Sequence, residues 1–219
     1  SCLHGYLGGR PSDRRAMTKN QNAASAWTSQ ALGWVLAVLS AMGLLASFQL
    51  LKGEITLLRD PTAALACDLN PLIGCSSGLL APQGHLLIIP NAGVGLFLFG
   101  MLLALAAVLI GGAGLPRLVW WGLGAGSLVG LGYVAYFLIV SITVFRTLCP
   151  YCMVVWLAIM ILVPLAWGGG MRAGAYGPGK EEAGKTVLKY SWAIALAEIL
   201  IVVLTVLLGL SDKVALLFG

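Results

Sequence analysis

The chain has 219 residues, of which 59% are hydrophobic and only 10% are charged, and its mean hydropathy is +0.95. Soluble domains carry about 25% charged residues, so this composition excludes an ordinary soluble protein. The formal net charge of +5 comes from basic residues scattered over tails and loops. They form no basic stripe interleaved with aromatic residues, so no nucleic-acid partner is expected. The predicted class is an all-α membrane protein.

Five apolar stretches are long enough to cross roughly 30 Å of hydrocarbon, which takes about 20 helical residues. Each is apolar all round, as a helix in lipid should be. In chain order they are Ala31–Leu51, His85–Ile110, Leu118–Val144, Pro150–Trp167 and Ser191–Leu210. The first has full membrane length and no nearby cleavage site, so it is expected to remain as an anchor rather than to act as a signal peptide.

The third stretch carries Gly122, Gly126 and Gly130 at four-residue spacing. Bare backbone along one helix face lets a neighbouring helix approach closely. The spacing therefore favours a compact bundle, although glycine is also common in membrane helices without such a role.

The distribution of basic residues predicts the orientation in the membrane. One side of the predicted membrane holds nine of them: Arg10, Arg14, Arg15, Lys19, Arg117, Arg172, Lys180, Lys185 and Lys189. The other side holds four, which are Lys52, Arg59, Arg146 and Lys213. The positive-inside rule then places the N-terminus in the cytoplasm and, after five spans, the C-terminus outside. The predicted location is the inner or plasma membrane.

The predicted spans divide the chain into four parts. Residues 1–30 form a cytoplasmic tail, and residues 31–167 form a four-helix unit with an outer loop at 52–84. Residues 168–190 form a cytoplasmic loop, and residues 191–219 form a fifth transmembrane helix with a short outer tail. The segment Gly168–Gly184 is rich in glycine and charge, which indicates a flexible connection.

Four of the five cysteines fall on the predicted outer side. Cys67 and Cys75 lie in the first outer loop as C-D-L-N-P-L-I-G-C, and Cys149 and Cys152 form C-P-Y-C where the fourth helix begins. Thiols outside the cytoplasm can persist as disulfides. Paired cysteines at one membrane face are therefore predicted to be redox-active or structural.

The C-P-Y-C motif has the more specific chemistry. Proline suits the first position of a helix, so Cys149 is predicted at the N-cap and Cys152 in the first turn. The positive helix end lowers a thiol pKa there, and low-pKa thiolates are good leaving groups. A disulfide between these two cysteines should accept electrons readily. The loop pair can pass electrons by exchange, with Asn70 and Pro71 turning the chain so that its sulfurs meet.

A relay of this kind needs a terminal acceptor, and a lipid-soluble quinone can reach Cys152 from within the bilayer. Residues that hold the quinone carbonyl oxygens must donate hydrogen bonds at that depth. Asn91 lies near the outer end of the second helix, where a lone amide needs a partner. Trp156 is four residues after Cys152, on the same helix face, and its indole N–H only donates. Cys152, Asn91 and Trp156 are therefore the predicted quinone-binding residues.

These residues resemble the vitamin K epoxide reductase family in its bacterial form. The resemblance covers about residues 31–167 and rests on C-D-L-N-P-L-I-G-C, on P-N-A-G opening the second helix and on C-P-Y-C opening the fourth. It implies a four-helix transmembrane bundle around a quinone, here menaquinone or ubiquinone, with an additional fifth helix. Animal members have tyrosine where this chain has Trp156. The second quinone contact is thus an indole N–H, another residue or packing alone.

The resemblance also implies roles for the cysteines in a quinone-dependent thiol oxidoreductase. Cys149 and Cys152 would form the active-site pair with Cys152 beside the quinone. Cys67 would exchange with the outside thiol donor, and Cys75 would pass electrons to Cys149. In bacterial relatives the donor is a thioredoxin-fold protein, sometimes fused at the C-terminus. No such domain follows the fifth helix, so a separate extracytoplasmic partner is expected.

Other functions stay open at this point. The DsbB family does similar chemistry, but there the C-x-x-C comes first, and this chain has the reverse order. Reduction of vitamin K epoxide itself is a second enzymatic alternative. The four cysteines could also form structural disulfides or a zinc site with four thiolate ligands. The spacing of seven residues between Cys67 and Cys75 departs from the usual zinc pattern, so no metal is expected.

Several polar residues have two interpretations each. His85 is either a proton donor to the reduced quinone or a solvated interfacial histidine. Ser76 and Ser77 either hydrogen-bond into the site or serve the turn. Glu198 more naturally snorkels or pairs with a neighbour than acts in catalysis, and Cys2 is more naturally an idle thiol than a relay member.

Overall fold

The computed structural model describes residues 11–70, 72–86 and 89–212, with the side chains of residues 11–28 and Leu86 outside that description. Five helices are long and apolar enough to cross a membrane within this part of the chain. They lie in α1 (Pro11–Arg59), α3 (Asn91–Ile110), α4 (Arg117–Val140) with the π-helical turn Ser141–Phe145, α5 (Pro150–Arg172) and α7 (Ser191–Gly209). The prediction of an all-α membrane protein is confirmed.

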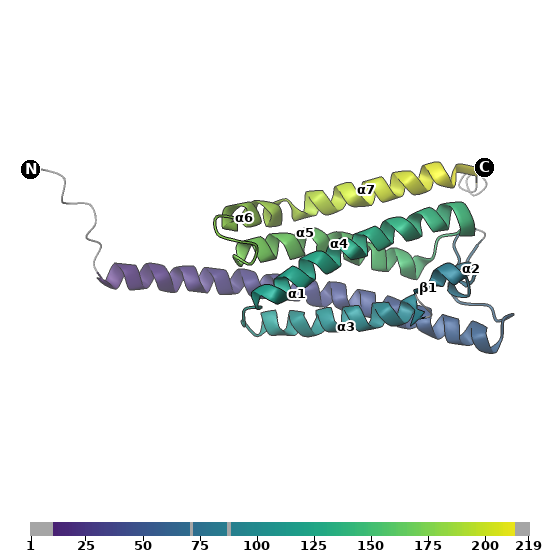
Figure 1. Ribbon diagram of the computed structural model, residues 1–219, viewed down its shortest axis with the longest axis horizontal. Helices are drawn as coiled ribbons and strands as arrows, with labels where there is room; N and C mark the ends of the chain where they lie inside the picture. The colour runs from purple at the N-terminus through teal and green to yellow at the C-terminus, as the bar shows by residue number, and fades with distance from the viewer. Residues whose placement is uncertain (1–10, 71, 87–88, 213–219) are drawn as a thin grey trace, which may run out of the picture.

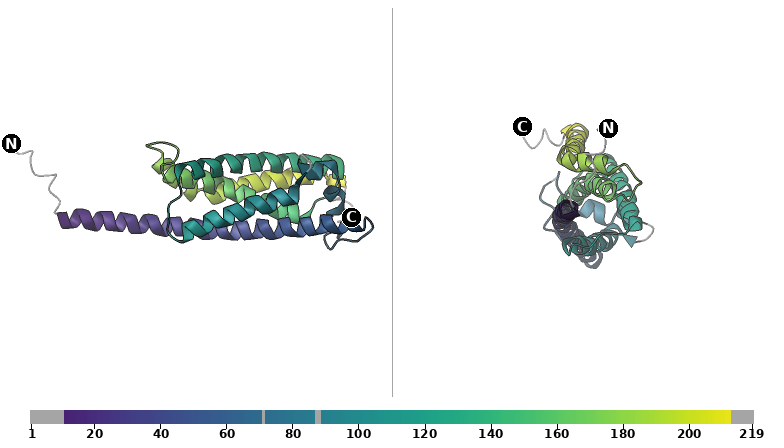
Figure 2. Two further views of the ribbon diagram at one scale, coloured as in Figure 1. Left: turned by 60° about the horizontal axis from the view of Figure 1, so that its bottom comes forward. Right: turned by 90° about the vertical axis from the view of Figure 1, so that its left-hand side faces the viewer.

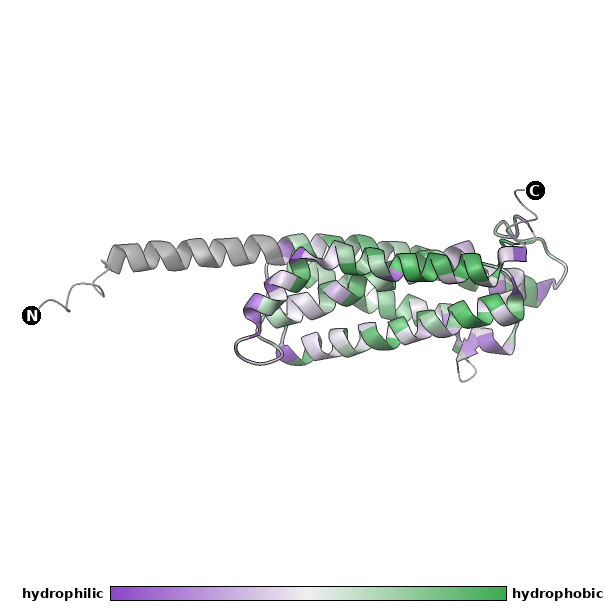
Figure 3. Ribbon diagram, turned by 90° about the horizontal axis from the view of Figure 1, so that it is seen from above, coloured by the Kyte–Doolittle hydropathy of each residue, from purple (hydrophilic) through white to green (hydrophobic). Residues whose placement is uncertain are grey.

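Helix α5 contacts most of the other long helices. It packs against α1, α4, α7 and the short helix α6 (Glu181–Lys189), while α3 packs along α1. Viewed down the bundle, α1, α3, α4 and α5 surround a common centre and α7 lies outside them (Figure 2). Hydrophilic residues gather at the two ends and hydrophobic residues fill the length between them (Figure 3). This distribution fits a bilayer between the two ends.

The centre of the bundle is filled by apolar side chains from four helices. Leu36, Leu109, Ala106, Ala158 and Ala166 are almost fully buried, and Trp120 closes the cluster near the start of α4. Small residues alternate with leucines, so the helices approach closely over this region. This packed region reaches the end of the bundle where α3 and α5 end and α4 begins. The cysteines lie at the opposite end, where α5 begins.

Helix α1 extends beyond the predicted span Ala31–Leu51 in both directions. Its C-terminal extension is held by Glu54 and Leu57, each 3% exposed. The helix ends where Pro61 disfavours helical backbone at Asp60, and Asp60 Oδ1 accepts the Thr62 N–H at 3.0 Å. The outer loop therefore begins at residue 60, after the end of α1 at Arg59, rather than at the predicted residue 52.

The second membrane helix begins at Asn91 rather than at the predicted His85. The preceding residues form a two-stranded antiparallel hairpin of β1 (His85–Leu86) and β2 (Ile89–Pro90). Pro90 lacks an N–H and favours extended backbone before it, which explains why the helix starts only after it.

The predicted glycine face of α4 is wrong for two of its three members. Gly122 and Gly126 have no neighbouring atom within 4 Å of where a Cβ would be, and only Gly130 approaches α5, at Ile159. The inward face instead runs through Gly124 and Ser127, both buried. Gly124 lies under the Tyr176 hydroxyl.

The predicted flexible connection Gly168–Gly184 is largely ordered helix and packed turn. Helix α5 continues to Arg172, and α6 folds back against it. Gly168, Gly169 and Gly170 are buried because Leu188, Trp120 and Tyr176 occupy the space that side chains would need. A run of three glycines here serves close packing rather than flexibility.

Candidate active site

Cys149 caps the N-terminus of α5, as predicted. Its backbone is extended, Pro150 follows in the first helical turn, and its sulfur accepts the Cys152 backbone N–H at 3.5 Å. The hydrogen bond from the Cys152 thiol, aided by the backbone N–H groups of Cys152 and Tyr151, lowers the pKa of Cys149. Burial and the negative charge of Asp68 oppose this effect without reversing it. Cys149 is thus the member of the pair that ionises first.

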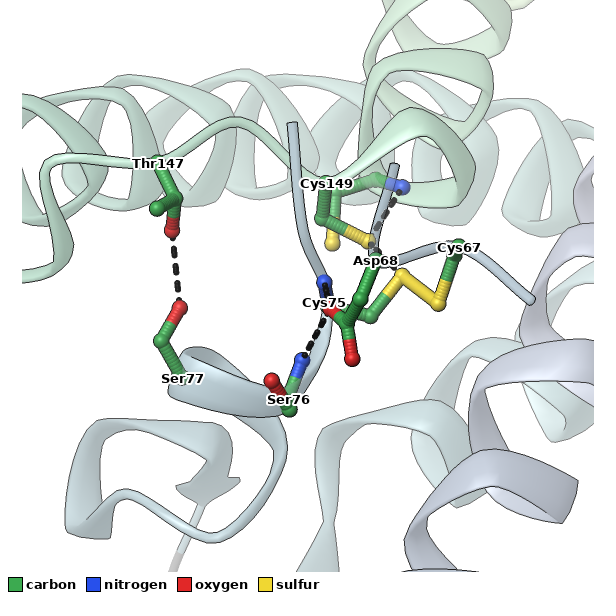
Figure 4. The surroundings of a disulfide bond; sticks show 8 residues. Cys67, Asp68, Cys75, Ser76, Ser77, Thr147 and Cys149 are labelled. Carbon is green, nitrogen blue, oxygen red and sulfur yellow. Dashed lines mark hydrogen bonds between the residues drawn. A yellow bond between two sulfur atoms is a disulfide. The ribbon is translucent and has the colours of Figure 1, made fainter. Parts of the chain in front are cut away.

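Cys67 and Cys75 are joined by a disulfide (Figure 4). The chain between them turns at Asn70, whose Oδ1 accepts the N–H groups of Leu72 and Ile73. Asp68 Oδ1 accepts the Cys75 N–H at 2.7 Å and the Ser76 N–H at 3.2 Å. The side chains within the loop therefore fix the position of Cys75.

The disulfide loop is fastened to the turn that carries Cys149. The Leu148 N–H donates to Leu72 O at 2.8 Å, and the Gly74 N–H donates to Leu148 O at 3.0 Å. The hydroxyls of Ser77 and Thr147 share a hydrogen bond of 2.7 Å (Figure 4). These contacts join segments that are about 75 residues apart in sequence, as the parallel bridge between Ile73 and Leu148 shows.

The consequence is direct contact between the two cysteine pairs. Cys149 Sγ lies 3.3 Å from Cys75 Sγ, which belongs to the loop disulfide. The two sulfurs are therefore in contact, as the attacking sulfur and the disulfide sulfur must be in thiol–disulfide exchange. The arrangement is that of a thiol–disulfide relay.

A cavity of about 70 Å³ lies beside the sulfurs. Cys75, Cys149 and Cys152 line it, together with Asn91 and Glu54 and with apolar side chains that include Phe137 and Phe145. Asn91 Nδ2 donates to Gln83 O at 3.0 Å, and its buried Oδ1 has no protein partner among the described residues. A buried amide oxygen without a partner is costly, so it is suited to a ligand.

The family model described as "Vitamin K epoxide reductase family" matches residues 34–167. The chain belongs to the vitamin K epoxide reductase family. The matched range covers the four cysteines, Asn91 and the greater part of α1 and α5. A search among curated proteins gives no significant match. As a family member the protein is a multi-pass membrane oxidoreductase.

Trp156 is placed differently from Asn91 within this vitamin K epoxide reductase domain. It is 5% exposed and packs with Val134, Leu138 and Met160. It lines a second, apolar cavity of about 250 Å³ between α5 and α7, which does not include Asn91. The structure therefore does not bring the predicted quinone contacts Trp156 and Asn91 together, and a role for Trp156 in quinone binding stays a prediction.

Two acidic residues of the site were missed from the sequence. In the sequence Asp68 stands out only as part of the cysteine motif, although a carboxylate beside Cys67 is the natural acceptor for loop N–H groups. The predicted site does not include Glu54, although a carboxyl side chain within an apolar membrane helix is by itself a signal of function. Glu54 is paired with His85, so this histidine is not merely solvated, and the alternative prediction that it donates a proton to the reduced quinone stays a prediction.

The remaining predicted residues have these positions. Ser77 bonds Thr147 through its side chain, and Ser76 bonds Asp68 through its backbone. Glu198 lies on α7, and its Oε2 is buried without a partner in the described part of the chain. Cys2 lies outside the described residues. No cluster of three or more His, Cys, Asp or Glu side chains could hold a metal ion among the residues searched, which are the described ones.

Proposed function

We propose that this family member oxidises a separate extracytoplasmic thioredoxin-fold protein and passes the electrons to a membrane quinone, supporting disulfide bond formation. The observation that carries the proposal is the 3.3 Å contact between Cys149 Sγ and the Cys75 sulfur. Thiol–disulfide exchange requires an attacking sulfur to reach a disulfide sulfur, and two fixed pairs in contact allow electrons to pass between them.

Electrons would move through two exchanges. The partner reduces the loop disulfide by attacking Cys67, which leaves the partner oxidised and Cys67 and Cys75 as thiols. The Cys75 thiolate then attacks Cys149 of a Cys149–Cys152 disulfide and releases the Cys152 thiolate. Cys67 attacks Cys75 in turn, which restores the loop disulfide and leaves Cys149 and Cys152 reduced.

The bonding of the sulfurs corresponds to the form that has received electrons. Cys67 and Cys75 are oxidised, and Cys149 and Cys152 are free thiols. In this form the next step is oxidation of Cys149 and Cys152 by the quinone. The lowered pKa of Cys149 favours that step, because a disulfide forms from a thiolate.

The first cavity is the proposed site for the quinone ring, either menaquinone or ubiquinone. Cys152 and Asn91 both line it, and the unpartnered Asn91 Oδ1 could accept a hydrogen bond from a hydroxyl group of the reduced quinone. Its volume of about 70 Å³ is far below the roughly 300–1,000 Å³ of ordinary ligand pockets. We therefore expect its lining to move outward when quinone binds.

The end that carries the cysteines is the proposed extracytoplasmic end. Arg117, Arg172 and the lysines of α6 lie at the opposite end (Figure 1), and positive residues favour the cytoplasmic side. Cys67 is only 7% exposed, so the thiol partner would have to displace part of the loop to reach it.

Quinone reduction by the purified protein tests the proposal. With a thioredoxin-fold dithiol donor and a quinone, the wild-type protein should form quinol, and Cys152→Ala should abolish turnover. Cys152→Ala should also accumulate a Cys75–Cys149 link, visible by non-reducing mass spectrometry, because the Cys152 thiol that would attack Cys149 and release Cys75 is missing and only Cys67 can still resolve the link. Cys2→Ser, the matched cysteine control, should leave turnover unchanged. Undiminished quinone reduction by Cys152→Ala would exclude the route.

The same assay separates the enzymatic alternative. Vitamin K epoxide offered in place of the quinone should be reduced more slowly than the quinone. If the epoxide were the faster acceptor, the protein would be an epoxide reductase that uses the same cysteines.

A further inference from the structure

We propose that Glu54 and His85 form the proton inlet of the active site, with Glu54 delivering a proton to the quinone as it is reduced. This inference rests on the proposed function. It starts from two polar side chains that meet beside the first cavity, one from a membrane helix and one from the hairpin.

Glu54 is an expensive residue at its position. It lies on α1 within a candidate membrane span, its side chain is 4% exposed, and it lines the cavity that contains Cys149 and Cys152. A buried carboxyl destabilises a fold unless it is paired. Among the described residues its ion-pair partner is His85, and no lysine or arginine pairs with it.

The hydrogen bonds of His85 show that the pair holds a transferable proton. His85 Nδ1 lies 3.2 Å from Ala81 O, which can only accept, so Nδ1 carries a hydrogen. His85 Nε2 lies 2.9 Å from Glu54 Oε1. Two bare acceptors would repel each other at this distance, so one further proton lies between them, either on the imidazole or on the carboxyl.

The pair connects water to the cavity. The His85 side chain is 30% exposed, whereas that of Glu54 is 4% exposed and lines the same cavity as Cys149 and Cys152. A proton taken up by the imidazole can therefore pass to the carboxyl and from there into the cavity. The titratable groups that share the cavity with Glu54 are the thiols of Cys149 and Cys152 at the start of α5. His85, on β1, contacts the Glu54 carboxyl itself.

The proposed reaction requires such a donor. The Cys149 thiolate and the Cys152 thiol form a disulfide and give two electrons to the quinone, which needs two protons to become quinol. Cys152 supplies one proton. Because Cys149 reacts as a thiolate and brings none, the second proton comes from Glu54. Charge and atoms then balance, and His85 returns a proton to Glu54 from water.

Single-turnover measurements test this role. Protein reduced with dithiothreitol and then freed of it is mixed with quinone, and quinol formation is followed by absorbance. Glu54→Gln keeps the shape and a hydrogen bond but cannot give up a proton, so quinol formation should slow about 100-fold, as for loss of a general acid. The pH dependence of its rate should differ from that of the wild type, because only the ionisation of Cys149 is left to contribute to it. Glu198→Gln, the same change on α7, should stay within about twofold of wild type.

Two further measurements distinguish proton transfer from a structural role. His85→Gln should slow quinol formation, and added imidazole should restore part of the rate, because it can replace a missing proton carrier. Formation of the Cys75–Cys149 link, measured by mass spectrometry in the Cys152→Ala background, should be unaffected by Glu54→Gln. Normal formation of the link in this double variant would also show that Glu54→Gln folds with its cysteines in place, so that slow quinol formation could not be put down to misfolding.

The failing results are distinct. The proton role is overturned if Glu54→Gln forms quinol at the wild-type rate. It is also overturned if Glu54→Gln slows quinol formation and sulfur exchange equally and leaves the pH profile unchanged. Failure of the wild-type protein to form quinol at all overturns the proposed function instead.

Discussion

The α6 end and the cysteine end of the helical bundle lie at opposite ends of its long axis (Figure 1). They are closed in different ways. At the α6 end, the Tyr176 hydroxyl donates to Trp120 O at 2.9 Å, and its ring fills the space above Gly170 and Gly124. Arg117 Nε donates to Ala175 O at 2.6 Å and holds the chain after α5 in place. This end is closed by packing: the Tyr176 and Trp167 rings lie 5.0 Å apart, and the buried Trp167 Nε1 has no hydrogen-bond partner among the described residues.

The cysteine end is closed by hydrogen bonds between loops instead. Backbone bonds join Leu72 and Gly74 to Leu148, and a cavity remains beneath them with Asn91 Oδ1 unpartnered among the described residues. Dense packing stabilises a bundle but leaves no room for chemistry. The comparison teaches that stability and reactivity in this protein are assigned to opposite ends of the same helices.

The largest expected contrast comes from removing one side-chain contact at each end. Cys75→Ser should lower turnover with a protein thiol donor by more than about 100-fold, because the electron route is cut. Tyr176→Phe should change turnover by less than about twofold while lowering the free energy of unfolding by about 1 kcal/mol, the value of one hydrogen bond. Quinol formation and denaturant unfolding in detergent measure the two. A large loss of turnover in Tyr176→Phe would show that the ends are coupled.

A smaller effect is expected from the backbone that positions Cys75. In Gly74→Ala the new Cβ would lie 2.9 Å from Asp68 Oδ1, so Asp68 has to move away from the Cys75 N–H. Turnover should fall about tenfold, since displacements of about 1 Å in an active site can cost up to 100-fold. Gly93→Ala is the matched control, because nothing lies within 4 Å of its Cβ position. Equal turnover in both variants would mean that Asp68 does not position the disulfide.

The smallest effect concerns the charge of Asp68. Its negative charge raises the pKa of Cys149 and so works against the hydrogen bond from Cys152. Asp68→Asn keeps an acceptor oxygen and removes the charge, so the pKa of Cys149 should fall further. Cys149 alkylation, followed by mass spectrometry against pH, should then begin at lower pH than in wild type. Cys152→Ala should shift it the opposite way because the largest stabilising hydrogen bond is lost. A shift of Asp68→Asn to higher pH contradicts this electrostatic account.

The sequence by itself determined the membrane helices and the family. Length and hydropathy are local properties, so they located the five spans, and proline after Cys149 fixed the N-cap of α5 because its ring permits only a helix start there. The pairing of Cys67 with Cys75 and the family followed from residues close together in the chain. The family resemblance is confirmed over residues 34–167.

Only the tertiary structure decided which distant groups meet. The face of α4 that turns inward, the burial of Gly168–Gly170 and the separation of Trp156 from Asn91 all depend on side chains of other helices. So does the pairing of Glu54 with His85, which are 31 residues apart. In an all-round apolar helix the sequence carries no periodic signal for its buried face, and that face emerges only when the helices pack.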